Sequence, residues 1–284
     1  MINLVVALQA EARPIVEALD LVEDGPASIF PVYFNDGLSL IVSGVGRSYS
    51  AAAAAHLFNR TGQVLDQAWL NIGIAGHQKL PIGSVLIASR ITEQATGRRW
   101  YPPYVLDVDL SRSQLVTVDK PERYYPECCA YDMEASSFYQ IASRCSTAEL
   151  IQSLKIISDG PESSLDLTVD KISQLIADQM CSIESVLGQL SNLAQELDTA
   201  RVSQALVTNY LEQWHFTVTQ HNQLVALLGR LNARSASLRA LPDTSECNDA
   251  KAVLKWLEEK LLALPVNLSI VHSKDRVARV EQQS

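Results

Sequence analysis

The sequence contains no apolar run long enough to cross a membrane, and positive charge is scarce. Its 284 residues include 32 acidic and 23 basic side chains, a formal net charge of −9, which repels nucleic acid and anionic membrane surfaces. Glu11 and Arg13 end the first apolar run far short of the length of a signal sequence. We therefore expect a cytoplasmic protein that binds a small molecule, and no nucleic-acid or membrane partner.

Cysteine is equally scarce. The five cysteines include the adjacent Cys128 and Cys129 but show no CxxC spacing, so we expect reduced thiols, no structural disulfide and no metal site. Internal repeats, low-complexity tracts and coiled-coil heptads are also missing from the sequence. What the chain does have is 47% hydrophobic residues, enough for a sizeable core in one large domain or two modest ones.

The first two thirds of the chain alternates short β-rich runs with runs of helical period, which is typical of a sheet covered by helices on both faces. We expect helices over residues 48–59, 134–144 and 168–197. Strands are expected over residues 2–8, 29–34, 38–42, 68–73, 84–89, 114–118, 129–132 and 154–158. The prediction is an α/β domain of residues 1–197, with a three-layer mixed sheet.

From about residue 198 the helical pattern continues without strands. Residues 202–231 and 250–264 carry apolar side chains at helical spacing, and residues 241–246 between them have the composition of a turn or linker. We therefore expect a C-terminal helical extension over residues 198–284, with docking or oligomerisation as a hypothesis for its role.

Two polar segments follow predicted strands near the N-terminus, at the strand ends where α/β folds bind small molecules. Glu11 stands in the first turn of a predicted helix, where a carboxylate either stabilises the helix dipole or points into the crevice above the sheet. Gly44, Gly46 and Arg47 open the next helix. Their backbone N–H groups and the guanidinium can hold phosphate or another anion, or the turn is simply a tight connection.

Two acidic segments follow later strands. Asp132 and Glu134 flank Met133 between a strand and a helix. Asp132 can cap the helix, whereas Glu134 can accept hydrogen bonds from two neighbouring hydroxyls of a sugar, with Met133 as an adaptable apolar surface under the ring. Asp159 ends the last strand of the domain, where it either caps a turn or gives a proton to a nitrogen leaving group.

These segments, together with one around Asn71, stand in the order of the motifs of a known family. The matching stretches are Ala7–Glu11, Ser43–Gly46, Asn71–Gly76, Met133–Ala135 and Ser158–Asp159. Over about residues 1–196 the chain thereby resembles the 5′-methylthioadenosine/S-adenosylhomocysteine nucleosidases and the related purine nucleoside phosphorylases. No single motif decides the matter, but five in the same order argue against coincidence.

The resemblance implies a purine nucleoside substrate and a role for each matched residue. Glu11 would activate the attacking water, and Asp159, preceded by Ser158, would protonate the purine. Glu134 would accept the ribose hydroxyls, and Met133 would pack on the sugar. Such a site suits an oxocarbenium-like transition state, because it neutralises the departing base on one side and delivers a nucleophile from the other. The family also implies a homo-oligomer and no cofactor, with phosphate as a co-substrate only in a phosphorylase.

The chain departs from the family pattern near the expected substrate. The resemblance places Ile74 and Gly76 beside the nucleoside, yet Ile74 replaces a serine of the family motif. Lys155 stands where the family often has arginine, and Pro121 stands where an aromatic would stack on the base. The segment between residue 89 and the Met-Glu motif is shorter than in typical nucleosidases. A ring could come instead from one of three nearby aromatics that otherwise pack or form an interface, namely Trp100, Tyr101 and Tyr104.

Two classes of function fit these residues. The first is an enzyme, either a hydrolase that uses water or a phosphorylase that binds phosphate at the glycine turn. The second is a non-catalytic nucleoside-binding module. Three features favour it, namely Ile74, the shortened middle segment and the added helices. Retention of Glu11, Glu134 and Asp159 together favours an enzyme, because a merely structural protein has no physical need for all three carboxylates. Within that class we expect the hydrolase.

Overall fold

The computed structural model describes residues 1–25, 29–162, 167–200, 204–234 and 247–264. The chain divides into two compact units, unit 1 (Met1–Gln195) and unit 2 (Glu196–Ser284). The boundary expected from the sequence, at residues 197 and 198, and the boundary between the units both fall within one long helix, α5 (Met180–Ala200). No helix in the described ranges is long and apolar enough to span a membrane.

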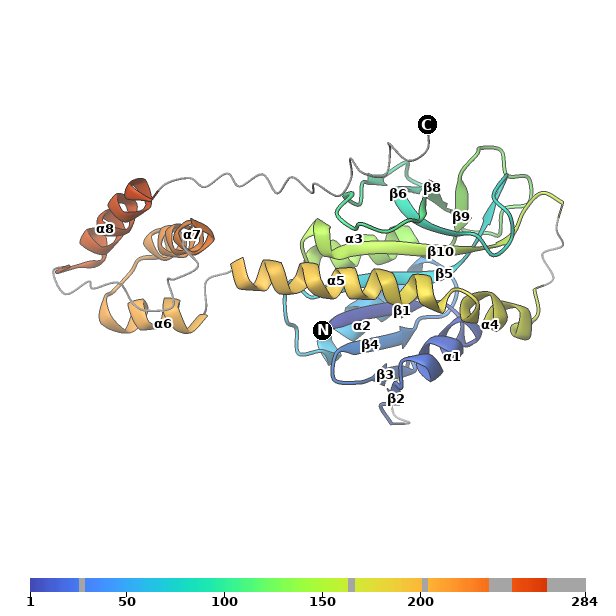
Figure 1. Cartoon of the computed structure of the whole chain (residues 1–284), viewed down its shortest axis with the longest axis horizontal. Helices are drawn as coiled ribbons and strands as arrows, with labels where there is room; N and C mark the ends of the chain where they lie inside the picture. The colour runs from blue at the N-terminus through green and yellow to red at the C-terminus, as the bar shows by residue number, and fades with distance from the viewer. Residues whose placement is uncertain (26–28, 163–166, 201–203, 235–246, 265–284) are drawn as a thin grey trace, which may run out of the picture. The chain divides into compact units, whose positions relative to one another are not determined.

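Unit 1 is built on a mixed sheet, whose ten strands in the described residues follow the order β10-β6-β8-β9-β5-β1-β4-β3-β2, with β7 paired to β6 (Figure 1). In chain order they are β1 (Ile2–Val6), β2 (Val22–Glu23), β3 (Val32–Phe34), β4 (Leu38–Val42), β5 (Ala68–His77), β6 (Val85–Glu93), β7 (Arg99–Trp100), β8 (Ser111–Thr117), β9 (Ala130–Asp132) and β10 (Ile151–Asp159). β5 pairs in parallel with β1 and β10, and its last two residues pair antiparallel with β9. Since β6 and β8 complete the pairing from β10 back to β9, these strands form a closed ring of hydrogen-bonded neighbours.

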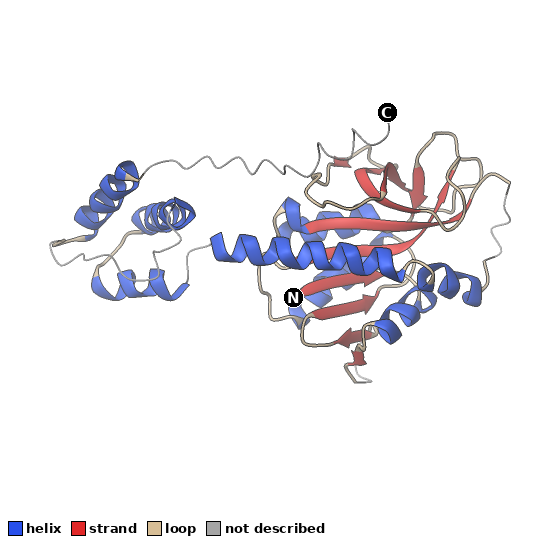
Figure 2. Ribbon diagram, viewed as in Figure 1, coloured by secondary structure: helices blue, strands red, loops and turns tan. Residues whose placement is uncertain are grey.

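Helices cover both faces of the sheet (Figure 2), as the sequence predicts. α2 (Arg47–Arg60) and α3 (Ala135–Cys145) pack together on one face, and α1 (Gln9–Ala18), α4 (Val169–Ala177) and α5 cover the other. A short 3-10 turn, η1 (Ala148–Leu150), precedes β10. The small side chains of Ala53 and Ala54 bring α2 close to a core that also holds Trp69 and Phe138. The predicted three-layer α/β architecture is confirmed.

The bounds of several predicted elements are wrong. Residues 168–197 form two helices, because Gln179 leaves the helical path and its side-chain amide donates to the Gly83 carbonyl at 3.1 Å. β6 continues to Glu93, past the polar residues at which the sequence pattern ends it, because its ladder with β8 continues to the Glu93–Thr117 pair. The two-residue strands β2 and β7 are too short to have a pattern of their own.

Unit 2 is helical in its described residues and contains α6 (Gln204–Gln213), α7 (Val218–Arg234) and α8 (Ala250–Ala263). The stretch of helical spacing over residues 202–231 is divided between α6 and α7, because Thr217 and Gln220 exchange hydrogen bonds in a capping box that starts α7. The predicted linker at residues 241–246 lies outside the described residues. The three helices bury a core of their own, made of Val207, Tyr210, Leu224, Leu227, Leu228, Leu231, Val253, Leu254, Leu257 and Leu261.

Candidate active site

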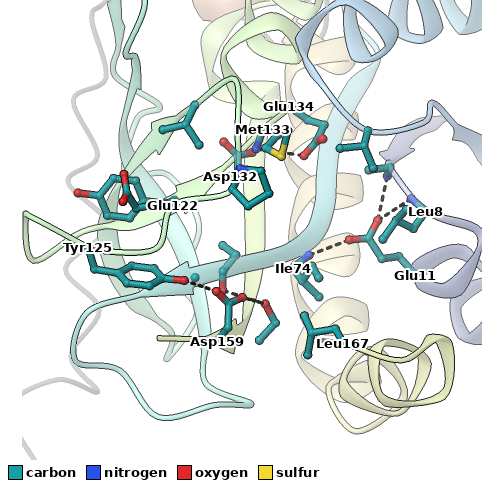
Figure 3. A pocket seen from close by; sticks show the side chains of 18 residues that line it. Leu8, Glu11, Ile74, Glu122, Tyr125, Asp132, Met133, Glu134, Asp159 and Leu167 are labelled. Atoms are coloured by element: carbon teal, nitrogen blue, oxygen red, sulfur yellow. Dashed lines mark hydrogen bonds between the residues drawn. The ribbon is translucent and has the colours of Figure 1, made fainter. Parts of the chain in front are cut away.

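A cavity of about 220 Å³ lies at the carboxyl ends of β1, β5 and β10 in unit 1. Figure 3 shows Glu11, Glu134 and Asp159 around it, each carried by a different segment of the chain. Apolar side chains form most of the remaining wall, which is the usual character of a small-molecule site with a few convergent polar groups. The sequence-predicted residues that line it are Glu11, Ile74, Gly76, Met133, Glu134, Ser158 and Asp159.

Glu11 is fixed at the end of β1 by backbone N–H groups. Its Oε2 accepts hydrogen bonds from Ala7 and Leu8 at 2.9 and 2.8 Å, and its Oε1 accepts one from Ile74 at 2.9 Å. Burial raises the pKa of Glu11, whereas the bonds from Ile74 and Leu8 and the charge of Lys155 oppose that rise. The carboxylate therefore ties the start of α1 to β5 and also borders the cavity in a fixed position.

Four buried charged residues meet beside the cavity. Lys155 Nζ lies 3.0 Å from Asp132 Oδ2, and the two side chains are 1% and 0% exposed. Burial lowers the pKa of Lys155, but the charges of Asp132, Glu134 and Glu11 outweigh it, so the pKa is raised and the amine stays cationic. Asp132 also accepts a hydrogen bond from the Ala135 N–H at 2.8 Å. Asp132 is thus the helix-capping group that the sequence allowed, and Lys155 is the counter-ion of the cluster.

Glu134 is the carboxylate of this cluster that changes charge near neutral pH. Its Oε1 accepts a hydrogen bond from the Gly46 N–H at 2.7 Å, and its Oε2 accepts one from Met133 at 3.3 Å. Burial and the charge of Asp132 raise the pKa of Glu134 to about 7, against the opposing charge of Lys155. Above that pH the ionised carboxylate is a pure acceptor, as recognition of two adjacent hydroxyls requires.

Asp159 receives a hydrogen bond on each carboxylate oxygen. Ser158 Oγ donates to Oδ1, and the Tyr125 hydroxyl donates to Oδ2 (Figure 3). Burial, reinforced by the neighbouring Asp159, raises the pKa of Tyr125, so the phenol stays protonated and acts as a donor. Asp159 is 8% exposed and faces the cavity from the end of β10.

Two glycines of β5 make room for these groups. A Cβ at Gly73 would lie 2.9 Å from Glu11 Oε1, closer than such contacts are found. At Gly76 a Cβ would lie 2.8 Å from Asp159 Oδ2 and would overlap the Tyr125 hydroxyl. The Asn-x-Gly-x-Ala-Gly segment therefore needs glycine at both positions because β5 passes directly beneath the carboxylates.

The glycine turn contributes less to the cavity than the sequence suggested. Gly44 and Gly46 have φ of 85° and 105°, a backbone region that favours glycine. Arg47 is held by ion pairs with Glu93 and with Asp119, the second at 2.8 Å. Since the Gly46 N–H already donates to Glu134, the predicted anion-binding groups are all engaged within the protein, and only Val45 of this turn lines the cavity.

Of the two alternatives for Trp100, Tyr101 and Tyr104, a ring for the base and an ordinary packing or interface role, the structure does not support the first, because none of the three lines the cavity. Trp100 packs against Tyr139, with ring centroids 6.5 Å apart, while Tyr101 and Tyr104 are exposed. The rings in the cavity wall are those of Tyr125 and Tyr131.

The sequence gives only a weak indication that Tyr125 lines the cavity. Tyr124 and Tyr125 are adjacent, and a pattern cannot tell which one turns inward. In the structure Tyr124 is 87% exposed and Tyr125 is 1% exposed.

No protein-family model matches the sequence, and no curated protein matches it. Solved structures do. A 5′-methylthioadenosine/S-adenosylhomocysteine nucleosidase from Colwellia psychrerythraea 34H, in complex with adenine, is similar at a TM-score of 0.55 and 18% identity, over 66% of this chain and 95% of that one. The corresponding nucleosidase of Campylobacter jejuni gives 0.54 and 18%, over 66% and 97%. A futalosine hydrolase of Helicobacter pylori gives 0.53 and 18%, over 64% and 96%.

The chain has the nucleosidase fold. Because these structures are covered almost completely while about a third of this chain is not, the uncovered third is additional to that fold. The cavity lies within unit 1, the part of the chain described by this fold. The sheet of unit 1 brings the carboxylates together.

Proposed function

We propose that the protein cleaves the N-glycosidic bond of a purine nucleoside resembling 5′-methylthioadenosine, with water as the nucleophile. One observation carries the proposal: Glu11, Glu134 and Asp159, far apart in sequence, border one cavity at the carboxyl edge of one sheet. An oxocarbenium-like transition state needs negative charge near the sugar, a base for the nucleophile and a proton for the departing ring. The three carboxyl groups can divide these tasks.

In the proposed reaction Glu134 accepts hydrogen bonds from the two ribose hydroxyls, and Met133 packs under the sugar. Water attacks the anomeric carbon while Glu11 takes its proton. The bond between that carbon and the purine nitrogen breaks, its electron pair leaves with the base, and Asp159 gives the base a proton. Glu11 suits the role of base because burial raises its pKa above the ordinary value of a carboxyl group, which makes the carboxylate a stronger base.

The charge of the cavity favours water over phosphate. Five acidic residues line it, and no lysine or arginine does among the residues that the structure describes; the acids are Glu11, Glu122, Asp132, Glu134 and Asp159. A phosphate dianion would meet more negative than positive charge there, because Lys155 is a single cation among several carboxyl groups, and the cation expected from the sequence, Arg47, is paired elsewhere. We therefore place the phosphorylase second.

The product identifies the nucleophile. We expect the purified protein to release free purine from 5′-methylthioadenosine in phosphate-free buffer made with ¹⁸O water, and the label to appear at the anomeric carbon of the free sugar. Strict dependence on phosphate, with a sugar 1-phosphate as product, would replace the hydrolase by the phosphorylase. Binding of adenine without turnover in either buffer would favour a non-catalytic nucleoside-binding module.

A further inference from the structure

Tyr125 occupies the place where the proposed function puts the departing base. Its hydroxyl donates to Asp159 Oδ2, the group that is to face the purine nitrogen. Its ring lies within the cavity wall and touches the β5 backbone at Gly76. Figure 3 shows the phenol reaching across the cavity wall to Asp159. A base that is to contact Asp159 through this oxygen has to take the place of the Tyr125 hydroxyl.

The backbone at Tyr125 is in an unusual conformation. Its φ is 45°, in the left-handed region that bulky residues rarely adopt and that often marks functional positions. Two contacts hold the residue there, since its carbonyl accepts a hydrogen bond from Gln78 Nε2 at 3.0 Å and its ring packs edge-on against Tyr131 at 5.7 Å. Tyr125 lies in the segment between β8 and β9, whose described residues form no helix or strand.

The size of the cavity is consistent with a Tyr125 side chain that fills space a base would need. At about 220 Å³ it is smaller than the roughly 300–1,000 Å³ of typical small-molecule pockets. Val118, Pro121 and the Tyr125 ring give the cavity an apolar surface after β8, beside the carboxyl groups of Glu122 and Asp159. Withdrawal of the Tyr125 side chain would enlarge this side and free one oxygen of Asp159.

We propose that Tyr125 is a gate for the base subsite, whose hydroxyl holds Asp159 until a purine displaces it. The inference rests on the proposed function. It predicts that the Tyr125–Asp159 contact stabilises the protein and weakens binding of the base, because the contact has to break before the base can bind. A residue that merely supported the fold, or one that contacted the base itself, would not give this pair of opposite effects.

The test compares Tyr125→Phe with Tyr131→Phe. Both changes remove one phenol oxygen from adjoining rings in the same cavity wall, but the Tyr131 hydroxyl contacts the Glu127 N–H rather than Asp159. Adenine, as the probe, should bind Tyr125→Phe about 3- to 10-fold more tightly than the wild type by calorimetric titration, since the hydrogen bond between Tyr125 and Asp159 no longer has to be broken. Tyr131→Phe should stay within about twofold of the wild type, and Tyr125→Phe should have the lower midpoint of urea unfolding.

The outcomes separate the gate from the proposed function. If the wild type binds adenine and Tyr125→Phe binds it equally or more weakly, the gate is overturned and the proposed function stands. An unchanged unfolding midpoint in Tyr125→Phe also overturns the gate. If neither protein binds adenine and the wild type cleaves no purine nucleoside, the proposed function fails and takes the gate with it.

Discussion

The charge of Glu134 is the residue-level feature that responds most directly to pH. Its pKa is raised to about 7 in the folded protein from an ordinary value of 4.5. Between these values the folded protein keeps a proton at this carboxyl that the unfolded chain releases. This group therefore makes the folded state less stable as pH rises from about 4.5 to about 7.

We predict that Glu134→Gln removes this pH dependence. Between pH 4.5 and 7 the free energy of unfolding of the wild type should fall relative to that of the variant, by on the order of 1–3 kcal/mol. Urea titrations across the range measure it. Glu17→Gln, on the exposed side of α1, is the control and should follow the wild type. Parallel curves for the wild type and Glu134→Gln would contradict the assignment of this titration to Glu134.

At the scale of residues, the sequence predicts which residues line the cavity better than it predicts the partners of each side chain. Glu11, Glu134 and Asp159 are recognisable because each follows a strand in a motif of known order. The partners of Arg47 are not, because Glu93 and Asp119 reach it only through folding. The inward orientation of Tyr125 is not predictable either, because it depends on a left-handed backbone at a residue that is not glycine.

At the scale of elements, β9 and β10 are joined through buried charge. Lys155 of β10 pairs with Asp132 of β9 and lies near Glu11 and Glu134. Removing one partner of a buried ion pair leaves the other uncompensated, which costs far more than loss of an exposed pair. Lys155 is the cation that these buried carboxyl groups need.

We expect Lys155→Met to destabilise the protein by about 3–5 kcal/mol at pH 7. The loss should shrink towards pH 5, where the carboxylates can take up protons instead. As a control, Lys255→Met removes an exposed lysine from an i,i+4 pair with Glu259 in α8 and should change stability by less than about 0.5 kcal/mol. Equal effects of the two changes in urea unfolding would show that the buried cation is dispensable.

The elements themselves were largely predictable where a period repeats. Helix α2 and strand β4 lie within one residue of their predicted bounds. The break between α4 and α5 was not predictable, because the apolar stripe runs through it, and the hydrogen bond from the Gln179 side chain to the Gly83 carbonyl at this break forms only in the folded chain. Ladder partners likewise extend β5 and β10 beyond their predicted bounds.

At the scale of the whole molecule, each unit has a core of its own. Leu154 in β10 and Leu257 in α8 are both fully buried, in unit 1 and unit 2 respectively. We predict two calorimetric unfolding transitions. Leu154→Ala should lower the midpoint temperature of only one and Leu257→Ala that of only the other, and each substitution should reduce the free energy of unfolding of its unit by about 2–5 kcal/mol. A single transition that both substitutions shift would mean that the two units unfold as one.

The proposed function requires that Glu11 and Asp159 act on one nucleoside in one cavity. Release of free adenine from 5′-methylthioadenosine, followed chromatographically, tests it for the wild type, Glu11→Gln and Asp159→Asn, with circular dichroism to verify that each variant is folded. We predict release by the wild type and a loss of at least about 100-fold in each variant. Undiminished release by either folded variant would contradict the account.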